Sequence, residues 1–266
     1  MKVAKIVIAV LSIYLVGAPL EPQENLDAKQ IVDRSFQSTK LAGSEMLSTM
    51  TIIDDRGRER VRKIATVSKL YDSGKTEKRL IRFLSPADVK GTGLLTFDYE
   101  SEDDDMWLFM PALRKTRRIV STEKAKNFMG SEFTYADMTP PILDDFTYEI
   151  LGEEEIAGTS CWRIAMIPVD DEVADENGFS RRIAFIAKGD FVIRRAVYYD
   201  LYGELLKELT VEEIKEIDPK NHRYRPMRMV MVNKQNDRKS VLNVDELQFN
   251  PDVNDEFFTT RYLERY

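Results

Sequence analysis

The sequence predicts a mainly β protein that folds around one antiparallel sheet of about ten or eleven strands. Short runs rich in apolar, aromatic and β-branched residues follow one another along most of the chain. Clusters of glycine, proline, aspartate and asparagine separate these runs at short intervals, which is typical of hairpin turns. Helices long enough to connect parallel strands are not indicated between the runs, so neighbouring strands should be antiparallel.

Length and charge narrow the class of protein. The chain has 266 residues, 43% of them hydrophobic, and a net charge of −7. A single domain is expected, because β barrels of roughly 200–250 residues remain one domain. The acidic balance argues against a nucleic-acid-binding protein, which would carry a basic surface.

The first residues have the pattern of a secretory signal peptide. Two lysines precede an apolar run and a small-residue site, and the run is short for a membrane span. We therefore expect a signal peptide at residues 1–18, a single domain at 19–266 and a periplasmic location. Because Pro19 would follow the cut and disfavours cleavage, an uncleaved inner-membrane anchor is the alternative.

The elements after this segment follow in order. Asp27 to Thr39 is predicted to form a helix, with Asp27 and Gln30 as a capping box. An acidic loop is expected at 170–177, a short helical piece at 139–146, and a docking helix around Phe257, Phe258 and Tyr262. Hairpin turns are predicted at 54–57, 157–158, 188–190, 202–203, 218–221 and 235–238.

The centre of the chain, residues 94–138, carries the most information. Three strands are expected at 94–99, 106–110 and 115–120, and the second is apolar on both faces. Four cations follow it at Arg114, Lys115, Arg117 and Arg118. The segment 128–138 is apolar without a regular period, so it should lie against another apolar surface.

Three motifs in this region resemble one protein family. They are KGTGLLTFDY at 90–99, DMWLFMPALRKTRRI at 105–119 and FMGSEFTYADM at 128–138. Their order is similar to that of the outer-membrane lipoprotein-sorting proteins of the LolA-like group. The resemblance implies a strongly curved antiparallel sheet, an unclosed barrel, with a few helices plugging its concave side. It also implies carriage of acyl chains or lipoproteins across the periplasm and brings no catalytic motif.

No catalytic, metal or cofactor site is predicted. The one histidine, His222, lies in a polar turn, and the one cysteine, Cys161, reads as a small buried residue beside a tryptophan. The acidic turn 100–105 lacks the spacing and glycine of a calcium loop and reads as solvated. An enzyme is therefore not expected, although a carboxylate pair assembled by the fold stays open.

Candidate binding residues are apolar or basic. Methionines at every second position of 227–231 share one face of a strand, and they serve either core packing or a lining for acyl chains. The basic cluster is either a solvated strand end or a contact for lipid headgroups or a partner. The candidates for lipid contact are Trp107, Phe109, Phe128, Met129, Phe133, Met227, Met229 and Met231, and those for headgroup or partner contact are Arg114, Lys115, Arg117 and Arg118.

Two functions fit these observations. The first is a periplasmic carrier that binds acyl chains of lipids or lipoproteins in an apolar cavity and moves them toward the outer membrane without covalent chemistry. Its partners would be an inner-membrane exporter, such as one of the resistance-nodulation-division type, and an outer-membrane acceptor. The second is a periplasmic sensor that uses the same fold to detect lipoproteins and regulate a partner.

Overall fold

A computed structural model describes residues 26–265, and its main element is one antiparallel sheet of 13 strands. The sheet order is β6-β5-β4-β3-β2-β1-β13-β12-β11-β10-β9-β8-β7. Strands that follow one another in sequence pair with each other, except β6 and β7, which form the two edges of the sheet. The pairing of β1 with β13 joins the two halves. The strands are β1 (Gly43–Ile53), β2 (Glu59–Tyr71), β3 (Thr76–Ser85), β4 (Gly93–Tyr99), β5 (Asp105–Met110), β6 (Lys115–Arg118), β7 (Phe146–Ile156), β8 (Thr159–Pro168), β9 (Arg181–Ala187), β10 (Ile193–Tyr199), β11 (Leu205–Asp218), β12 (Arg223–Asn233) and β13 (Lys239–Phe249).

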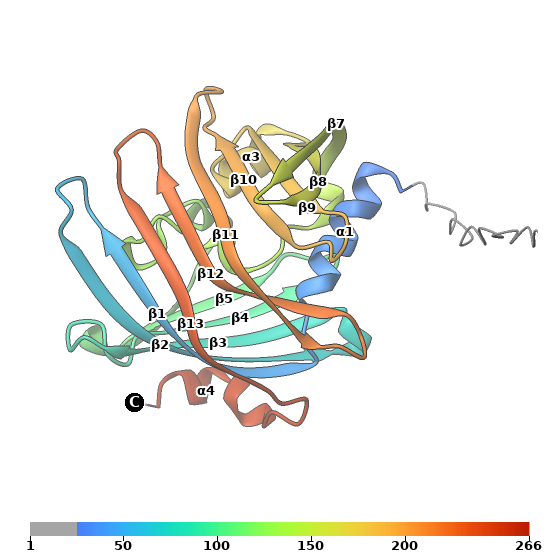
Figure 1. Cartoon of the computed structure of the whole chain (residues 1–266). Helices are drawn as coiled ribbons and strands as arrows, with labels where there is room; N and C mark the ends of the chain where they lie inside the picture. The colour runs from blue at the N-terminus through green and yellow to red at the C-terminus, as the bar shows by residue number, and fades with distance from the viewer. Residues whose placement is uncertain (1–25, 266) are drawn as a thin grey trace, which may run out of the picture.

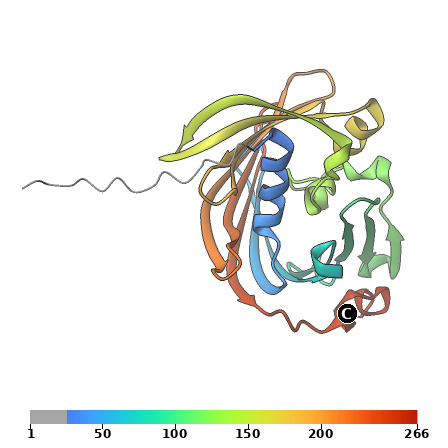
Figure 2. The same cartoon turned by 90° about the vertical axis from the view of Figure 1, so that its right-hand side faces the viewer.

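The sheet curves strongly but does not close, because its end strands β6 and β7 do not pair with each other (Figures 1 and 2). The predicted fold class is confirmed. Each predicted hairpin turn joins two strands at the expected place, and the total of 13 strands exceeds the predicted ten or eleven. Long-range pairing of β1 with β13 brings the two ends of the hairpin series together.

Helix α1 (Ala28–Thr39) lies inside the curve of the sheet, as Figure 2 shows. Its predicted capping box is present: Asp27 Oδ1 accepts from the Gln30 amide at 2.8 Å, and the Asp27 amide donates to Gln30 Oε1 at 3.0 Å. These bonds satisfy backbone donors that the first turn leaves free. Ile31 and Val32 are buried against the sheet, so the narrow apolar stripe fixes which face points inward.

Two local predictions need correction. The segment expected as an acidic loop contains helix α3 (Asp171–Asn177), which Asp170 caps through the Val173 amide at 2.9 Å and Gly178 ends in the left-handed conformation at φ 74°. The helical piece predicted at 139–146 is only a 3-10 turn at Leu143–Asp145. Consecutive prolines there keep the preceding residues extended.

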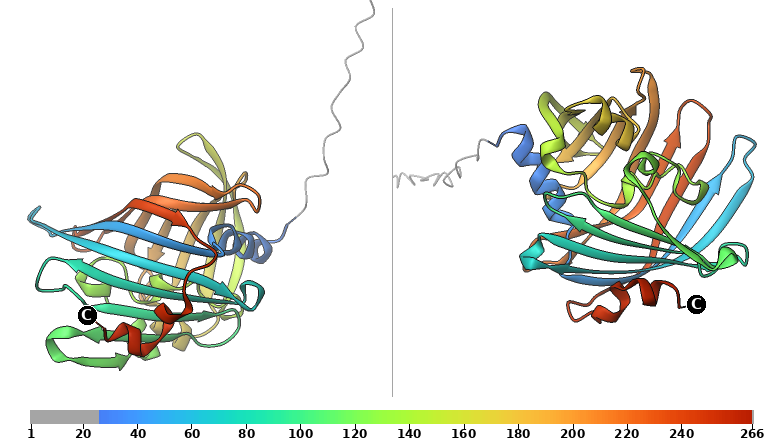
Figure 3. Two further views of the ribbon diagram at one scale, coloured as in Figure 1. Left: turned by 90° about the horizontal axis from the view of Figure 1, so that it is seen from below. Right: turned by 180° about the vertical axis from the view of Figure 1, so that it is seen from behind.

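The C-terminal segment covers the outer, convex face of the sheet, as Figures 1 and 3 show. It contains a 3-10 helix at Asp255–Phe258 and helix α4 (Thr260–Leu263), as the docking-helix prediction required. Phe258 and Leu263 are buried against β3, β4 and β5. The Arg82 guanidinium holds the segment by donating to the Leu263 carbonyl at 2.9 Å. A second, smaller core therefore lies outside the sheet.

The four-residue helix α2 (Ser121–Lys124) packs against α3 near the end of the central strands. Between residues 26 and 265, no helix is both long enough and apolar enough to cross a bilayer. The predicted signal peptide and the alternative of an uncleaved anchor fall outside the described residues.

Candidate lipid-binding cavity

A cavity of about 340 Å³ lies on the concave side of the sheet. Its floor is formed by strands on both sides of the β1–β13 pair, and its walls include α1 and the segment 128–138, which we call the strap. The size falls within the range of small-molecule sites, roughly 300–1,000 Å³. The cavity thus lies beneath α1 and the strap, the apolar segment that the sequence predicted to lie against another apolar surface.

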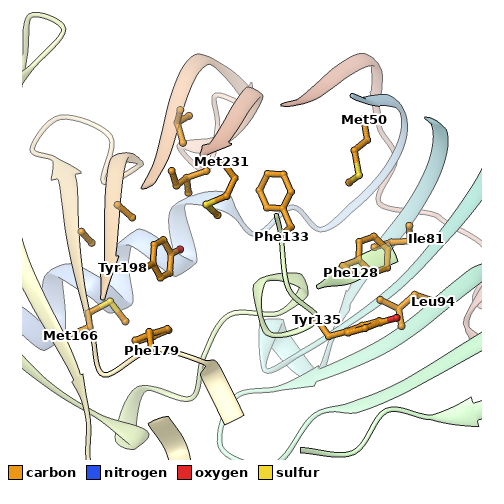
Figure 4. Close-up of a cluster of buried hydrophobic side chains, with 14 of the residues drawn as sticks. Met50, Ile81, Leu94, Phe128, Phe133, Tyr135, Met166, Phe179, Tyr198 and Met231 are labelled. Atoms are coloured by element: carbon orange, nitrogen blue, oxygen red, sulfur yellow. The ribbon is translucent and has the colours of Figure 1, made fainter. Parts of the chain in front are cut away.

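The cavity is lined mainly by apolar side chains. Alternate residues of each strand point to the same face, so a few positions from many strands build a continuous apolar wall. Figure 4 shows Phe133 of the strap standing between Met231 and Tyr198 on one side and Met50 and Phe128 on the other. The apolar lining includes Phe36, Met46, Met50, Ile64, Ile81, Phe128, Phe133, Met138, Phe179, Val192, Ile193, Leu209, Val211, Met229, Met231, Leu242 and Val244.

Polar bonds tie the strap to several strands of the sheet. Arg79 Nη1 on β3 donates to the Met138 carbonyl at 2.6 Å, and Lys207 Nζ on β11 lies 2.9 Å from Asp137 Oδ2. Glu132 accepts from Asn233 at 3.0 Å and pairs with Arg238 Nε at 3.1 Å. These bonds explain how a segment whose regular structure is limited to two 3-10 turns, Phe128–Gly130 and Ala136–Met138, holds its apolar side chains over the cavity.

Four of the eight predicted lipid-contact residues line the cavity: Phe128, Phe133, Met229 and Met231. Met129 is half-buried and packs against the same core without lining the cavity. Met227 is buried but does not line it either, because the β12–β11 pairing skips Met227 and shifts register there. A bulge of this kind disturbs the alternation of faces, so the strand places only Met229 and Met231 of the three methionines in the cavity lining.

Trp107 and Phe109 do not reach the cavity. They point to the outer face, where both pack in the cluster that the C-terminal segment covers, and Trp107 stacks edge-on with Phe97 at 5.0 Å between ring centroids. Met106 and Leu108, their neighbours in β5, occupy the inner core instead. The sequence indicated a strand covered on both sides but not which side faces the cavity, and we leave Trp107 and Phe109 out of the site.

The basic cluster divides into two parts. Arg117 pairs with Glu123 at 2.5 Å, and Arg118 pairs with Asp105. Arg114 and Lys115 are exposed and form no ion pair with any residue in the described part of the chain. Only this second part presents uncompensated charge to the surroundings.

The acidic turn at 100–105 is only partly solvated. Asp104 turns inward, where its side chain is 8% exposed and accepts from Thr139 Oγ1 at 2.6 Å. Burial raises the pKa of Asp98 on β4 to about 7, with further contributions from the Asp104 and Glu77 carboxylates. One Asp98 oxygen is buried without a hydrogen-bond partner. The expectation of a solvated turn is therefore wrong for Asp104.

Asp98→Asn should stabilise the protein at alkaline pH. A carboxyl whose pKa rises on folding, here from 3.8 to about 7, binds its proton more tightly in the folded state. Stability then falls as pH rises between these values. We expect the variant to raise the free energy of unfolding by about 1–3 kcal/mol at pH 8 and to leave it nearly unchanged at pH 4. Urea unfolding at both pH values measures this, with exposed Asp103→Asn as control; an equal effect at both pH values contradicts the explanation.

Four charged residues of the cavity wall were missed from the sequence: Arg79 on β3, Asp137 in the strap, Arg182 on β9 and Arg225 on β12. A signal for Arg182 exists: it shares a strand face with Ala184 and Ile186, which belong to the inner core. Among residues 26–265, no cluster of three or more histidine, cysteine, aspartate or glutamate side chains is placed to hold a metal ion.

The described residues thus form an open, curved sheet with a strap over an apolar cavity. Solved structures of other proteins share this fold. A domain of an outer membrane lipoprotein-sorting protein from Vibrio parahaemolyticus is 27% identical, with a TM-score of 0.81, over 90% of this chain and 98% of that chain. A DUF1329 family protein from Desulfovibrio piger is 28% identical, with a TM-score of 0.81, over 88% and 97%.

A LolA superfamily protein from Nitrosomonas europaea shares the fold at 18% identity, with a TM-score of 0.68 over 89% of this chain and 99% of that chain. A family model described as an uncharacterized protein matches residues 75–265, more than half of the chain. The comparison with curated proteins gives no match. The chain belongs to the family of that model and has a LolA-like fold.

Proposed function

We propose that residues 19–266 form a periplasmic carrier that binds acyl chains of lipids or lipoproteins. The observation that carries the proposal is the strapped apolar cavity on the concave face of the sheet. The relative from Vibrio parahaemolyticus, at 27% identity, is described as a lipoprotein-sorting protein, which supports the same role here. The carrier binds and releases its ligand without a covalent step.

The cavity offers enough binding energy for this role. Burial of a methylene group contributes about 0.8 kcal/mol. A chain of about 16 carbons would contribute on the order of 10 kcal/mol before the costs of ordering the ligand and the strap. Flexible methionines in the wall, Met46, Met50, Met229 and Met231, let the wall adapt to chains of different shape.

The direct test is to identify what the cavity holds in the cell. The protein is isolated from its native host under non-denaturing conditions and the bound lipid is measured by mass spectrometry. We expect an acyl-containing molecule in near-stoichiometric amount, and we expect the delipidated protein to bind a fluorescent fatty-acyl probe. Folded, delipidated protein that binds no acyl probe would falsify the carrier function.

We propose an inner-membrane exporter, such as one of the resistance-nodulation-division type, as donor and an outer-membrane component as acceptor. The exposed Arg114 ends the turn after β5 and the exposed Lys115 begins β6, and both suit contact with anionic lipid headgroups or an acidic partner surface. The paired Arg117 and Arg118 suit this role less, because Glu123 and Asp105 already compensate them.

Reversing both free charges, Arg114→Glu with Lys115→Glu, should slow delivery without unfolding the protein. Each basic residue near an anionic membrane contributes about 1 kcal/mol, so we expect transfer of an acyl probe to anionic vesicles to slow at least about fivefold. Stability should change little, because exposed charges contribute little to it. The same exchange at Arg56 and Lys75, on other exposed turns, is the control.

Unchanged transfer by the double variant would contradict a docking role for the turn. The transfer assay also separates the carrier from the sensor that the fold equally allows. A carrier releases the acyl probe to acceptor vesicles, whereas a sensor retains it.

A further inference from the structure

Two arginines in the cavity wall carry charges that the described residues leave uncompensated. The other charged lining residues are paired: Arg79 lies 2.8 Å from Glu77, and Asp137 lies 2.9 Å from Lys207. Arg182 and Arg225 form no ion pair with any residue between 26 and 265. An apolar cavity with two unpaired cations is a poor environment for a purely neutral ligand.

Arg225 projects from β12 into the cavity near the end of α1. Within residues 26–265, the one hydrogen-bond acceptor for its side chain is the Thr39 carbonyl, at a long 3.5 Å. Burial and, to a smaller extent, the neighbouring Arg79 lower its pKa to about 10, while Glu77 acts in the opposite direction. The guanidinium therefore stays charged at neutral pH. Glu77 does not form an ion pair with it, because Glu77 is bonded to Arg79.

Arg182 reaches the cavity from β9. Its guanidinium lies over the Tyr198 ring, 5.1 Å from the centroid, and its Nε is buried without a hydrogen-bond acceptor. The charge of Arg182 contributes to lowering the pKa of Asp137, but the Asp137 carboxylate already pairs with Lys207. An aromatic face supports a cation but supplies no acceptor for its N–H groups.

Leaving a charge buried without a partner is costly, and a guanidinium is best satisfied by a planar or tetrahedral oxyanion. Carboxylate and phosphate oxygens bind it through short, charge-assisted hydrogen bonds. We infer that the cavity takes an anionic amphiphile, with the carboxylate or phosphate of the headgroup on Arg225 or Arg182 and the acyl chain along Met229 and Met231. This assignment of ligand class rests on the proposed function.

The test compares two ligands that differ only in headgroup charge. Delipidated protein at pH 8 is titrated with palmitate and with 1-hexadecanol, both below their aggregation concentrations, by displacement of a neutral fluorescent acyl probe. We expect palmitate to bind at least about tenfold more tightly. Inorganic phosphate is titrated separately and should not displace the probe, because a free anion lacks the chain.

Variants locate the effect. Arg225→Gln and Arg182→Gln should each weaken palmitate binding at least about threefold and leave 1-hexadecanol binding within about twofold, whereas Arg225→Lys should retain part of the preference. Arg56→Gln, on an exposed turn, is the control. Circular dichroism checks the fold of each variant, and if one arginine variant does not fold, the other decides.

The outcomes separate two claims. Equal affinity of wild type for palmitate and 1-hexadecanol, or an equal loss for both ligands in the arginine variants, overturns the anionic-ligand inference while the carrier function stands. Displacement of the probe by inorganic phosphate alone also overturns it, since the arginines would then form a simple anion site. Binding of neither lipid by folded protein refutes the carrier function itself.

Discussion

Met229→Glu is expected to weaken binding of a fluorescent fatty-acyl probe at least about tenfold while the protein remains folded. Met229 lines the cavity from β12 and is only half-buried, so a glutamate there can keep partial contact with water in the empty protein. Binding of an acyl chain would remove that water and leave the carboxylate without a partner. Such desolvation costs far more than the roughly 1.4 kcal/mol that corresponds to tenfold affinity.

The matched control places the same charge on the opposite face of the sheet. Val61 on β2 is 47% exposed, whereas its strand neighbour Ile64 lines the cavity. Val61→Glu should therefore leave acyl binding unchanged. Equal binding by Met229→Glu and Val61→Glu, with both variants folded by circular dichroism, would mean that the acyl chain does not enter this cavity.

Much of the fold could be predicted from local sequence signals. Turn residues such as Lys188, Gly189 and Asp190 mark hairpin ends, and the alternation of apolar residues between them marks strands. The capping box of Asp27 and Gln30 fixes the start of α1 because both partners lie within one turn. Local signals fail where a loop composition hides a capped helix, as for α3, whose Asp170 and Gly178 act as its two ends.

The candidate site was less predictable, because it depends on which face of each strand turns inward. Phe128 and Phe133 line the cavity from the strap, whose apolar sequence indicated contact with another apolar surface. Trp107 faces outward because the C-terminal segment, distant in sequence, supplies a second core. Met227 does not line the cavity, and it lies at a bulge that depends on pairing with β11. Arg225 was overlooked because the sequence does not show that it lines the cavity or that no carboxylate of the described residues pairs with it.

The outer core should control stability without controlling binding, and Leu263→Ala tests this separation. Leu263 is 0% exposed and packs with Leu80, Leu95 and Phe109 on the convex face. Truncating a buried leucine leaves a cavity, so we expect the free energy of unfolding in urea to fall by about 2–5 kcal/mol.

Leu113→Ala, at a position 64% exposed, is the control and should change stability by less than about 0.5 kcal/mol. The whole thickness of the sheet separates Leu263 from the acyl cavity, so the affinity of folded Leu263→Ala for the acyl probe should match that of the wild type. An unchanged urea midpoint would show that the C-terminal segment is not a structural part of the domain. A stable variant with lost binding would instead show that the convex face communicates with the cavity, for which β3, β4 and β5 offer a route because they carry side chains to both cores.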